Sequence, residues 1–211
     1  MKTQSANPAA SRGGASAGAA AVAAIAALLW PLAARAHETH GGASGFAGGF
    51  LHPVSGLDHV VAMVAVGLWG AQLGPPLLWL LPVAFPMMMA VGGFLGLIGV
   101  PLPLVEVAIA ASAIVLGTLV AARARPPVVV CVLVVAAFAL FHGHAHGAEL
   151  PPNSDALTYS LGFVVATGLL HGVGILLGAM HQWPAGARVV RAMGLAVAAA
   201  GVWFLVSTFR S

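Results

Sequence analysis

Six long apolar runs constrain this chain more than any other feature of its sequence. Each run is near the length of about 20 residues that a helix needs to cross a bilayer, and Gly, Pro or Arg residues separate the runs. The runs are apolar all round rather than alternating, which favours helices over the strands of a barrel. The sequence therefore predicts an all-α fold, a polytopic membrane helix bundle with six transmembrane helices. We place them at residues 55–73, 77–99, 103–122, 127–146, 157–180 and 187–208.

The composition agrees with a membrane protein and argues against nucleic-acid binding. Hydrophobic residues make up 60% of the chain and charged residues 6%, whereas about 25% is usual for charged residues in soluble domains. The formal charge of +3 arises at the N-terminus, because Lys2, Arg12 and Arg35 are three of the 8 basic residues; the other five balance the 5 acids. The 9 histidines outnumber the acids, which directs attention to metal ions.

Residues 1–36 are predicted to be a secretory signal peptide that precedes a membrane domain at residues 37–211. Lys2 and Arg12 form a basic region, an Ala-rich apolar run follows at residues 15–32, and Ala34-Arg35-Ala36 has the small-residue pattern of a cleavage site. The apolar run is rather long, so an uncleaved anchor helix is the alternative. In both cases the residues that follow begin outside the cytoplasm.

A first testable prediction concerns this cleavage. If the signal peptide is removed after Ala36, the mature chain begins at His37. Intact-mass spectrometry of protein purified from membranes should then give a chain that starts at His37. A chain that starts at Met1 would contradict cleavage and would leave a seventh span.

The arginines set the orientation of the spans. Cytoplasmic loops of membrane proteins carry an excess of Lys and Arg. With the mature N-terminus outside, six spans place four arginines in the cytoplasm and two acids outside. The arginines are Arg123, Arg125, Arg188 and Arg191, and the acids are Glu149 and Asp155. We therefore expect the mature N-terminus and both acids to lie outside the cytoplasm.

The first chemical motif runs from His52 to Met63 at the mouth of the first span. It contains His52, Asp58, His59 and Met63. Imidazole suits nickel, cobalt, zinc and copper, a carboxylate adds charge and a thioether adds softness. Ionisable groups are costly at membrane depth and usually face a cavity or the bundle interior. We expect Pro53 to be the first helical residue, with Asp58 and His59 about one and a half turns inside. A cluster that only caps the helix is the alternative.

The second motif ends the fourth span, at residues 141–151. His142 and His146 share a face of a continuous helix, whereas His144 would point away. Partial unwinding at the intervening glycines would let all three histidines converge, as in the broken helices of transporter sites. With Glu149 three residues on, the motif predicts a metal site. A polar helix end is the alternative, and a catalytic zinc site would also fit three histidines.

Three further histidines are candidate metal ligands. His37 and His40 could capture metal outside, or they could belong to a polar N-terminal segment without that role. His171 lies in the middle of the fifth span, where it could bind metal or hydrogen-bond to another helix. Because the predicted topology places both motifs on the same side of the membrane, we expect the first and fourth spans to meet at their outer ends, with His171 as the floor of a shared site. Gly168 and Gly172 form a G-x-x-x-G pattern, which predicts close approach to a neighbouring helix.

Three other features carry weaker predictions. Glu106, at the start of the third span, is a site residue of lower weight. Met87 to Met89 are expected to pack, because methionine fills irregular gaps. Cys131 is the only cysteine and should be a buried thiol.

The two motifs together resemble the HupE/UreJ family of hydrogenase and urease accessory proteins. The similarity rests on the pattern from His52 through Gly56, Asp58 and His59 to Met63, and on the stretch from Phe141 to Glu149. It extends over essentially the whole chain. The resemblance implies a secondary transporter of nickel, sometimes cobalt, that supplies metalloenzyme assembly. It also implies hydrogenase or urease maturation proteins as partners and no prosthetic group, since the metal is the cargo.

The resulting hypothesis is a permease rather than an enzyme. The sequence shows no G-x-x-x-x-G-K-[ST] motif for ATP. The mixed nitrogen and oxygen donors suit an ion that must leave as well as enter. The alternatives are a membrane accessory protein that delivers metal without transport, and a membrane zinc hydrolase. The predicted metal residues are His37, His40, His52, Asp58, His59, Met63, His142, His144, His146, Glu149 and His171.

Overall fold

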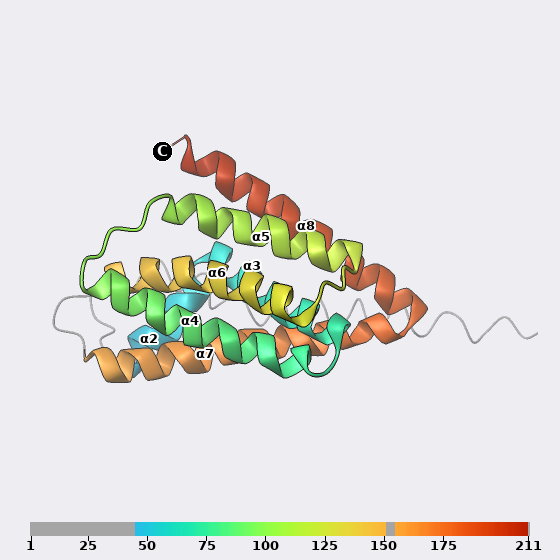
Figure 1. Cartoon of the computed structure of the whole chain (residues 1–211), viewed down its shortest axis with the longest axis horizontal. Helices are drawn as coiled ribbons and strands as arrows, with labels where there is room; N and C mark the ends of the chain where they lie inside the picture. Colours follow the sequence, from blue (N-terminus) through green and yellow to red (C-terminus); the bar gives the residue numbers. More distant parts are fainter. Residues whose placement is uncertain (1–44, 151–154, 211) are drawn as a thin grey trace, which may run out of the picture.

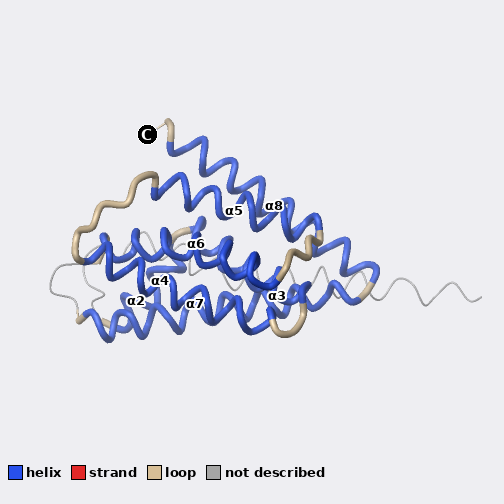
Figure 2. Tube along the Cα trace, in the orientation of Figure 1, coloured by secondary structure: helices blue, strands red, loops and turns tan. Residues whose placement is uncertain are grey.

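The computed structural model describes residues 45–150 and 155–210, and within these ranges the chain forms helices and no strands (Figures 1 and 2). The predicted signal peptide at residues 1–36, with His37 and His40, lies outside the described residues. The helices are α2 (Phe46–Ser55), α3 (Leu57–Leu73), α4 (Leu77–Leu97), α5 (Val105–Ala122), α6 (Val128–Ala148), α7 (Ala156–Gly178), the 3-10 turn η2 (Ala179–Gln182) and α8 (Pro184–Thr208).

Five of the described helices are long and apolar enough to cross a membrane. They are α4, α5, α6, α8 and the unit of α7 with η2. The pair α2 and α3 passes the same test only when taken together, and the two helices meet at an angle of 85°. The helices thus indicate a multi-pass membrane protein, with five candidate spans among the described residues, or six if the bent pair counts as one.

The predicted start of the first span is wrong. Pro53 lies inside α2 rather than at the first position of a helix, and α3 begins only at Leu57. Gly56 separates the two helices with an extended backbone (φ −94°, ψ 112°). Asp58 and His59 therefore lie in the first turn of α3, where they are closer to the helix end than predicted. The break brings α2 back across α7 and turns His52 toward the bundle.

Glycines let the helices pack in three close pairs. The most extensive contacts join α4 to α6, α5 to α8 and α3 to α7, and Figure 1 shows α5 lying along α8. A Cβ atom at Gly143 would lie 2.0 Å from the Met89 carbonyl oxygen, and one at Gly92 would lie 2.0 Å from that of Leu140. A Cβ at Gly117 would lie 2.5 Å from the Ala198 nitrogen. Small residues at such positions let backbones approach without lipid between them.

The prediction that Gly168 and Gly172 mediate close packing is wrong. A Cβ atom at either glycine would have no neighbour within 4 Å. The close contact lies on another face of α7, where a Cβ at Gly174 would be 2.2 Å from the carbonyl oxygen of Val64. The partner glycine on α3 is Gly67. The motif spacing was correct for a glycine face, but spacing alone could not show which face meets α3.

This difference predicts unequal effects of alanine at two glycines of one helix. Gly174→Ala should destabilise the protein by about 1–3 kcal/mol, the usual cost of overpacking a filled interior. Gly172→Ala should be neutral or slightly stabilising, because alanine is the better helix former and the site has room. Thermal unfolding in one detergent should separate the two variants. Equal melting temperatures would contradict the packing of α3 on α7.

Three hydrogen bonds join α3 to the segment at the end of α5, at the opposite end of α3 from His59. The Trp69 indole donates to the carbonyl of Ala124 (3.0 Å), and the Gln72 side chain donates to that of Val120 (3.2 Å). The Arg125 guanidinium donates to the carbonyl of Gln72 (3.1 Å). The acceptors lie in the last turn of α3 or α5 or just after α5, and the Val120 carbonyl also accepts from the Arg123 backbone N–H (3.1 Å). The three bonds hold α3 against the end of α5 at the predicted cytoplasmic end of the bundle.

The structure tests the packing predicted for the cysteine and for the three adjacent methionines. Cys131 is fully buried, as predicted. Of the three adjacent methionines, Met89 is buried and packs as predicted, but Met87 is 65% exposed. The helical turn points Met87 away from the bundle, toward the region that lipid would occupy.

Candidate functional site

The two histidine motifs meet at one end of the bundle. The His59 ring, on α3, lies 4.7 Å from the His142 ring and 4.2 Å from the His146 ring, both on α6 (centroid distances). The His52 ring, on α2, lies 4.7 Å from that of His146. The predicted juxtaposition of the first and fourth spans is therefore confirmed as geometry. His59, His142 and His146 are buried, so these rings face the interior rather than lipid.

The outer part of this cluster has the geometry of a metal site. One donor atom from each of His52, His146 and Glu149 lies within 4.8 Å of the other two. His52 Nε2 is 3.5 Å from a Glu149 carboxylate oxygen. The hydrogen bond from His52 lowers the pKa of Glu149, which follows the last residue of α6, below its ordinary value. The Glu149 side chain is 61% exposed, so an ion arriving from solvent would meet this carboxylate first.

Asp58 orients His59. One carboxylate oxygen of Asp58 accepts hydrogen bonds from the His59 backbone N–H (2.9 Å) and from ring nitrogen Nδ1 (3.0 Å). An ionised carboxylate only accepts, so Nδ1 carries the proton, and in the neutral ring Nε2 then keeps its lone pair. Carboxylates hold metal-binding histidines in this way in many proteins. Gly56 leaves the necessary space, because a Cβ there would lie 2.9 Å from Asp58 Oδ1.

Several buried ring nitrogens have no hydrogen-bond partner in the described part of the chain. They are His59 Nε2, His142 Nδ1, and both nitrogens of His146 and of His171. Leaving a buried polar group unsatisfied costs about 1–3 kcal/mol, so such groups are rare in native interiors without a water or an ion. A bound cation would satisfy the nitrogens that carry lone pairs. This clustering is the strongest physical sign of a metal site in the molecule.

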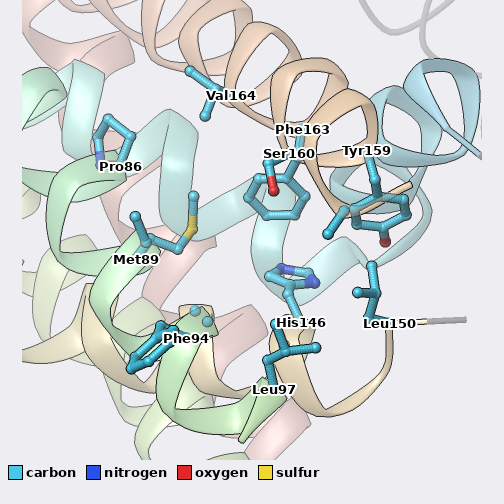
Figure 3. Close-up of a pocket in the computed structure, with 15 residues that line it drawn as sticks. Pro86, Met89, Phe94, Leu97, His146, Leu150, Tyr159, Ser160, Phe163 and Val164 are labelled. Carbon is cyan, nitrogen blue, oxygen red and sulfur yellow. The ribbon is translucent and has the colours of Figure 1, made fainter. Parts of the chain in front are cut away.

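A cavity of about 260 Å³ lies beside His146, between α4, α6 and α7 (Figure 3). Figure 3 shows the His146 side chain projecting toward Phe163, whose ring centroid is 4.4 Å away. Most of the other lining residues are apolar, among them Pro86, Met89, Phe94, Leu97, Leu150 and Val164. The cavity therefore gives His146 open space on one side but few further donors.

The ring of His171, on α7, is in contact with an aromatic ring that also contacts the main cluster. The Phe85 ring is 5.6 Å from the His142 ring and 5.3 Å from the His171 ring. Phe85, His142 and His171 are all essentially inaccessible to solvent. His171 was predicted as the floor of the site; its described ring contact is with Phe85, whereas the rings of His52, His59, His142 and His146 contact one another.

Two predicted metal residues lie apart from the cluster. Helix α6 is continuous through the second motif, so the unwinding that would gather all three histidines does not occur. His144 instead donates from Nε2 to the carbonyl of Val100, on the loop after α4 (2.7 Å). The Met63 side chain is fully buried in the hydrophobic core.

Three residues gain importance from the structure. Glu106, given lower weight from sequence, lies close enough to Asp58 and Glu149 to interact with their charges. Ser112 on α5 hydrogen-bonds to His142, and Phe85 contacts two histidines. Ser112 and Phe85 sit in apolar runs without a motif, so only their contacts across the bundle reveal them.

Comparison with known proteins agrees with the two motifs. The family model described as HupE / UreJ protein matches residues 25–204. The chain is 49% identical over 183 residues to Protein HupE of Rhizobium leguminosarum bv. viciae, an alignment that spans 86% of this chain and 95% of that protein. No solved structure is similar enough to match.

Proposed function

The chain belongs to the HupE/UreJ family, and from this premise we propose that it is a secondary transporter that imports a divalent transition metal. The family is associated with nickel and cobalt uptake for hydrogenase and urease, and it is an accessory and transport family rather than an enzyme family. Nickel is the proposed cargo, with cobalt second. The bacterial inner membrane, with the mature N-terminus in the periplasm, is the proposed location.

One observation carries the proposal: buried imidazole nitrogens that have no hydrogen-bond partner among the described residues adjoin a partly exposed histidine and carboxylate, which suggests a path from the surface into the bundle. The path begins at the exposed carboxylate of Glu149 and the half-exposed ring of His52. It continues to the buried rings of His146, His59 and His142. His171, whose ring is 5.3 Å from that of Phe85, would receive the ion next. The two motifs would thus form successive parts of one route.

The donor set fits the proposed cargo. Imidazole nitrogen with one or two carboxylates suits nickel and cobalt, and selectivity among such metals comes from geometry and ligand type. A transport site must bind an ion firmly enough to admit it and weakly enough to release it. Half-exposed donors such as His52 and Glu149 suit rapid exchange with solvent. Asp58 would act mainly by orienting His59, and His37 and His40 remain predicted capture residues.

Transport is tested with purified protein in liposomes that contain a trapped fluorescent nickel chelator. Nickel added outside should quench the dye faster in these vesicles than in protein-free vesicles. Cobalt should compete with nickel, and magnesium should compete poorly because it prefers oxygen ligands. Quenching no faster than in protein-free vesicles, with correctly inserted protein, would refute transport.

A membrane accessory protein that hands metal to hydrogenase or urease maturation proteins is the second candidate. The close packing of the inner half of the bundle favours it, since Val66, Leu68 and Trp69 are fully buried. A transporter must open this region, whereas an accessory protein need not. The second candidate predicts nickel binding by the detergent-solubilised protein without accumulation in vesicles.

A further inference from the structure

The side chain of Ser112 makes an unusual contact for a residue inside an apolar helix. Its hydroxyl oxygen lies 2.9 Å from Nε2 of His142, which belongs to α6. Ser112 and His142 are both fully buried, so water does not compete for this hydrogen bond.

The position of the serine proton determines the direction of the bond. The Ser112 hydroxyl donates to the carbonyl of Ile109 at 2.6 Å, one turn back in α5. A hydroxyl has one proton to give, and its oxygen can still accept. With the hydroxyl proton directed at the Ile109 carbonyl, the contact with His142 runs from the ring to the serine, and Nε2 is the donor.

The other ring nitrogen of His142 is consequently left with its lone pair. In a neutral imidazole one nitrogen carries the proton and the other accepts. His142 Nδ1 is buried and has no hydrogen-bond partner among the described residues. The adjacent ring of His59, 4.7 Å away, is arranged in the same manner by Asp58, with Nε2 free.

We propose that Ser112 is a positioning residue that fixes the tautomer of His142, so that Nδ1 is the nitrogen offered to the transported ion. The inference rests on the proposed function, because it assumes that His142 binds the metal. The bond runs between α5 and α6 and therefore also sets the rotation of the ring. Serine would act on His142 as Asp58 acts on His59, but without adding a charge to the membrane interior.

The tautomer matters because only a nitrogen with a lone pair can bind a metal ion. If the acceptor oxygen of Ser112 is removed, the hydrogen bond that favours the Nε2-protonated tautomer of His142 is lost. Part of the population would then carry the proton on Nδ1, where the metal must bind. Loss of such a partner costs about 10- to 100-fold in metal affinity.

The test uses the full-length protein, labelled with ¹⁵N-histidine and free of metal, in detergent or nanodiscs. The spectrum of a His142→Ala variant identifies the His142 signals by their absence. The unchanged protein should show His142 protonated on Nε2 alone. Ser112→Ala should add the Nδ1-protonated form and should weaken nickel binding about 10- to 100-fold by titration calorimetry.

Thr118→Ala provides a matched control on the same helix. The Thr118 hydroxyl also donates to a backbone carbonyl one turn back, that of Ile114 (2.7 Å), but the side chain is exposed. This variant should change neither the His142 signals nor the nickel affinity. Ser112→Thr retains the hydroxyl and should restore the Nε2-protonated form.

Two results would overturn the inference: His142 protonated on Nδ1 in the unchanged protein, or a Ser112→Ala variant with unchanged nickel affinity. Failure of the proposed transport would look different. In that case the vesicles would not accumulate nickel, while Ser112→Ala would still weaken nickel binding and change the His142 signals. That combination would support the role of Ser112 in an accessory protein.

Discussion

Replacing His146 by alanine should reduce nickel uptake by about 100-fold or more. Loss of a mere hydrogen-bond partner of a metal ligand costs about 10- to 100-fold in affinity, and His146 would be a ligand itself. Its ring contacts both His52 and His59, so it joins the outer and inner parts of the cluster. Uptake of radioactive nickel by cells, corrected for the amount of protein in the membrane, measures the effect.

His144→Ala is the matched control for this prediction. His144 lies two residues away on α6, but its ring bonds to the Val100 carbonyl rather than joining the cluster. Uptake should stay within about twofold of the unchanged protein, although the melting temperature should fall slightly with the loss of one hydrogen bond. If His144→Ala reduces uptake as strongly as His146→Ala, the structural assignment of His144 is wrong.

The second large loss of nickel uptake is expected from substitutions at the start of α3. His59→Ala removes a ring that contacts both His142 and His146, and uptake should fall about as far as in His146→Ala. Asp58→Ala leaves the His59 ring in place but removes the partner that fixes its tautomer. A smaller loss of nickel uptake, of about 10- to 100-fold, is therefore expected. Met87→Ala should have little effect, because this side chain is 65% exposed on the outer surface of α4.

Protein yield and melting temperature must be compared for these three variants before uptake is interpreted. A similar loss in all of them, at matched protein levels, would show that the bundle had been destabilised as a whole. Normal uptake by the Asp58 variant would instead show that His59 needs no orienting partner.

The spans could be predicted well because their length and hydropathy are local properties. The boundaries of α4, α5 and α8 differ from the predicted ones by at most three residues. Helix α2 was missed, since a glycine-rich segment followed by Pro53 is a poor helix signal. It is stabilised by a contact distant in sequence, where Gly49 lies against the backbone of Tyr159 on α7.

The site could be predicted by residue type but only partly by arrangement. The density of histidine and carboxylate identified both motifs, and the positive-inside rule placed them at the same end. Sequence spacing could not show that Asp58 turns to its neighbour His59, or that Phe85 contacts both His142 and His171. Such relations depend on how separate helices rotate against one another, which no local pattern encodes.

The glycine contacts between helices have a mechanical consequence. In each close pair, α3 with α7, α4 with α6 and α5 with α8, glycines bring the two backbones together over an extensive contact. We therefore expect each pair to move as one rigid body. The first carries His59 and His171, the second carries Phe85 and His142, and the third carries Ser112. The distances between donor atoms on different pairs then depend on how the pairs slide or rock against one another. A rocking motion of a few ångströms would remove the ligands on one side of a bound ion and leave the packing within each pair unchanged.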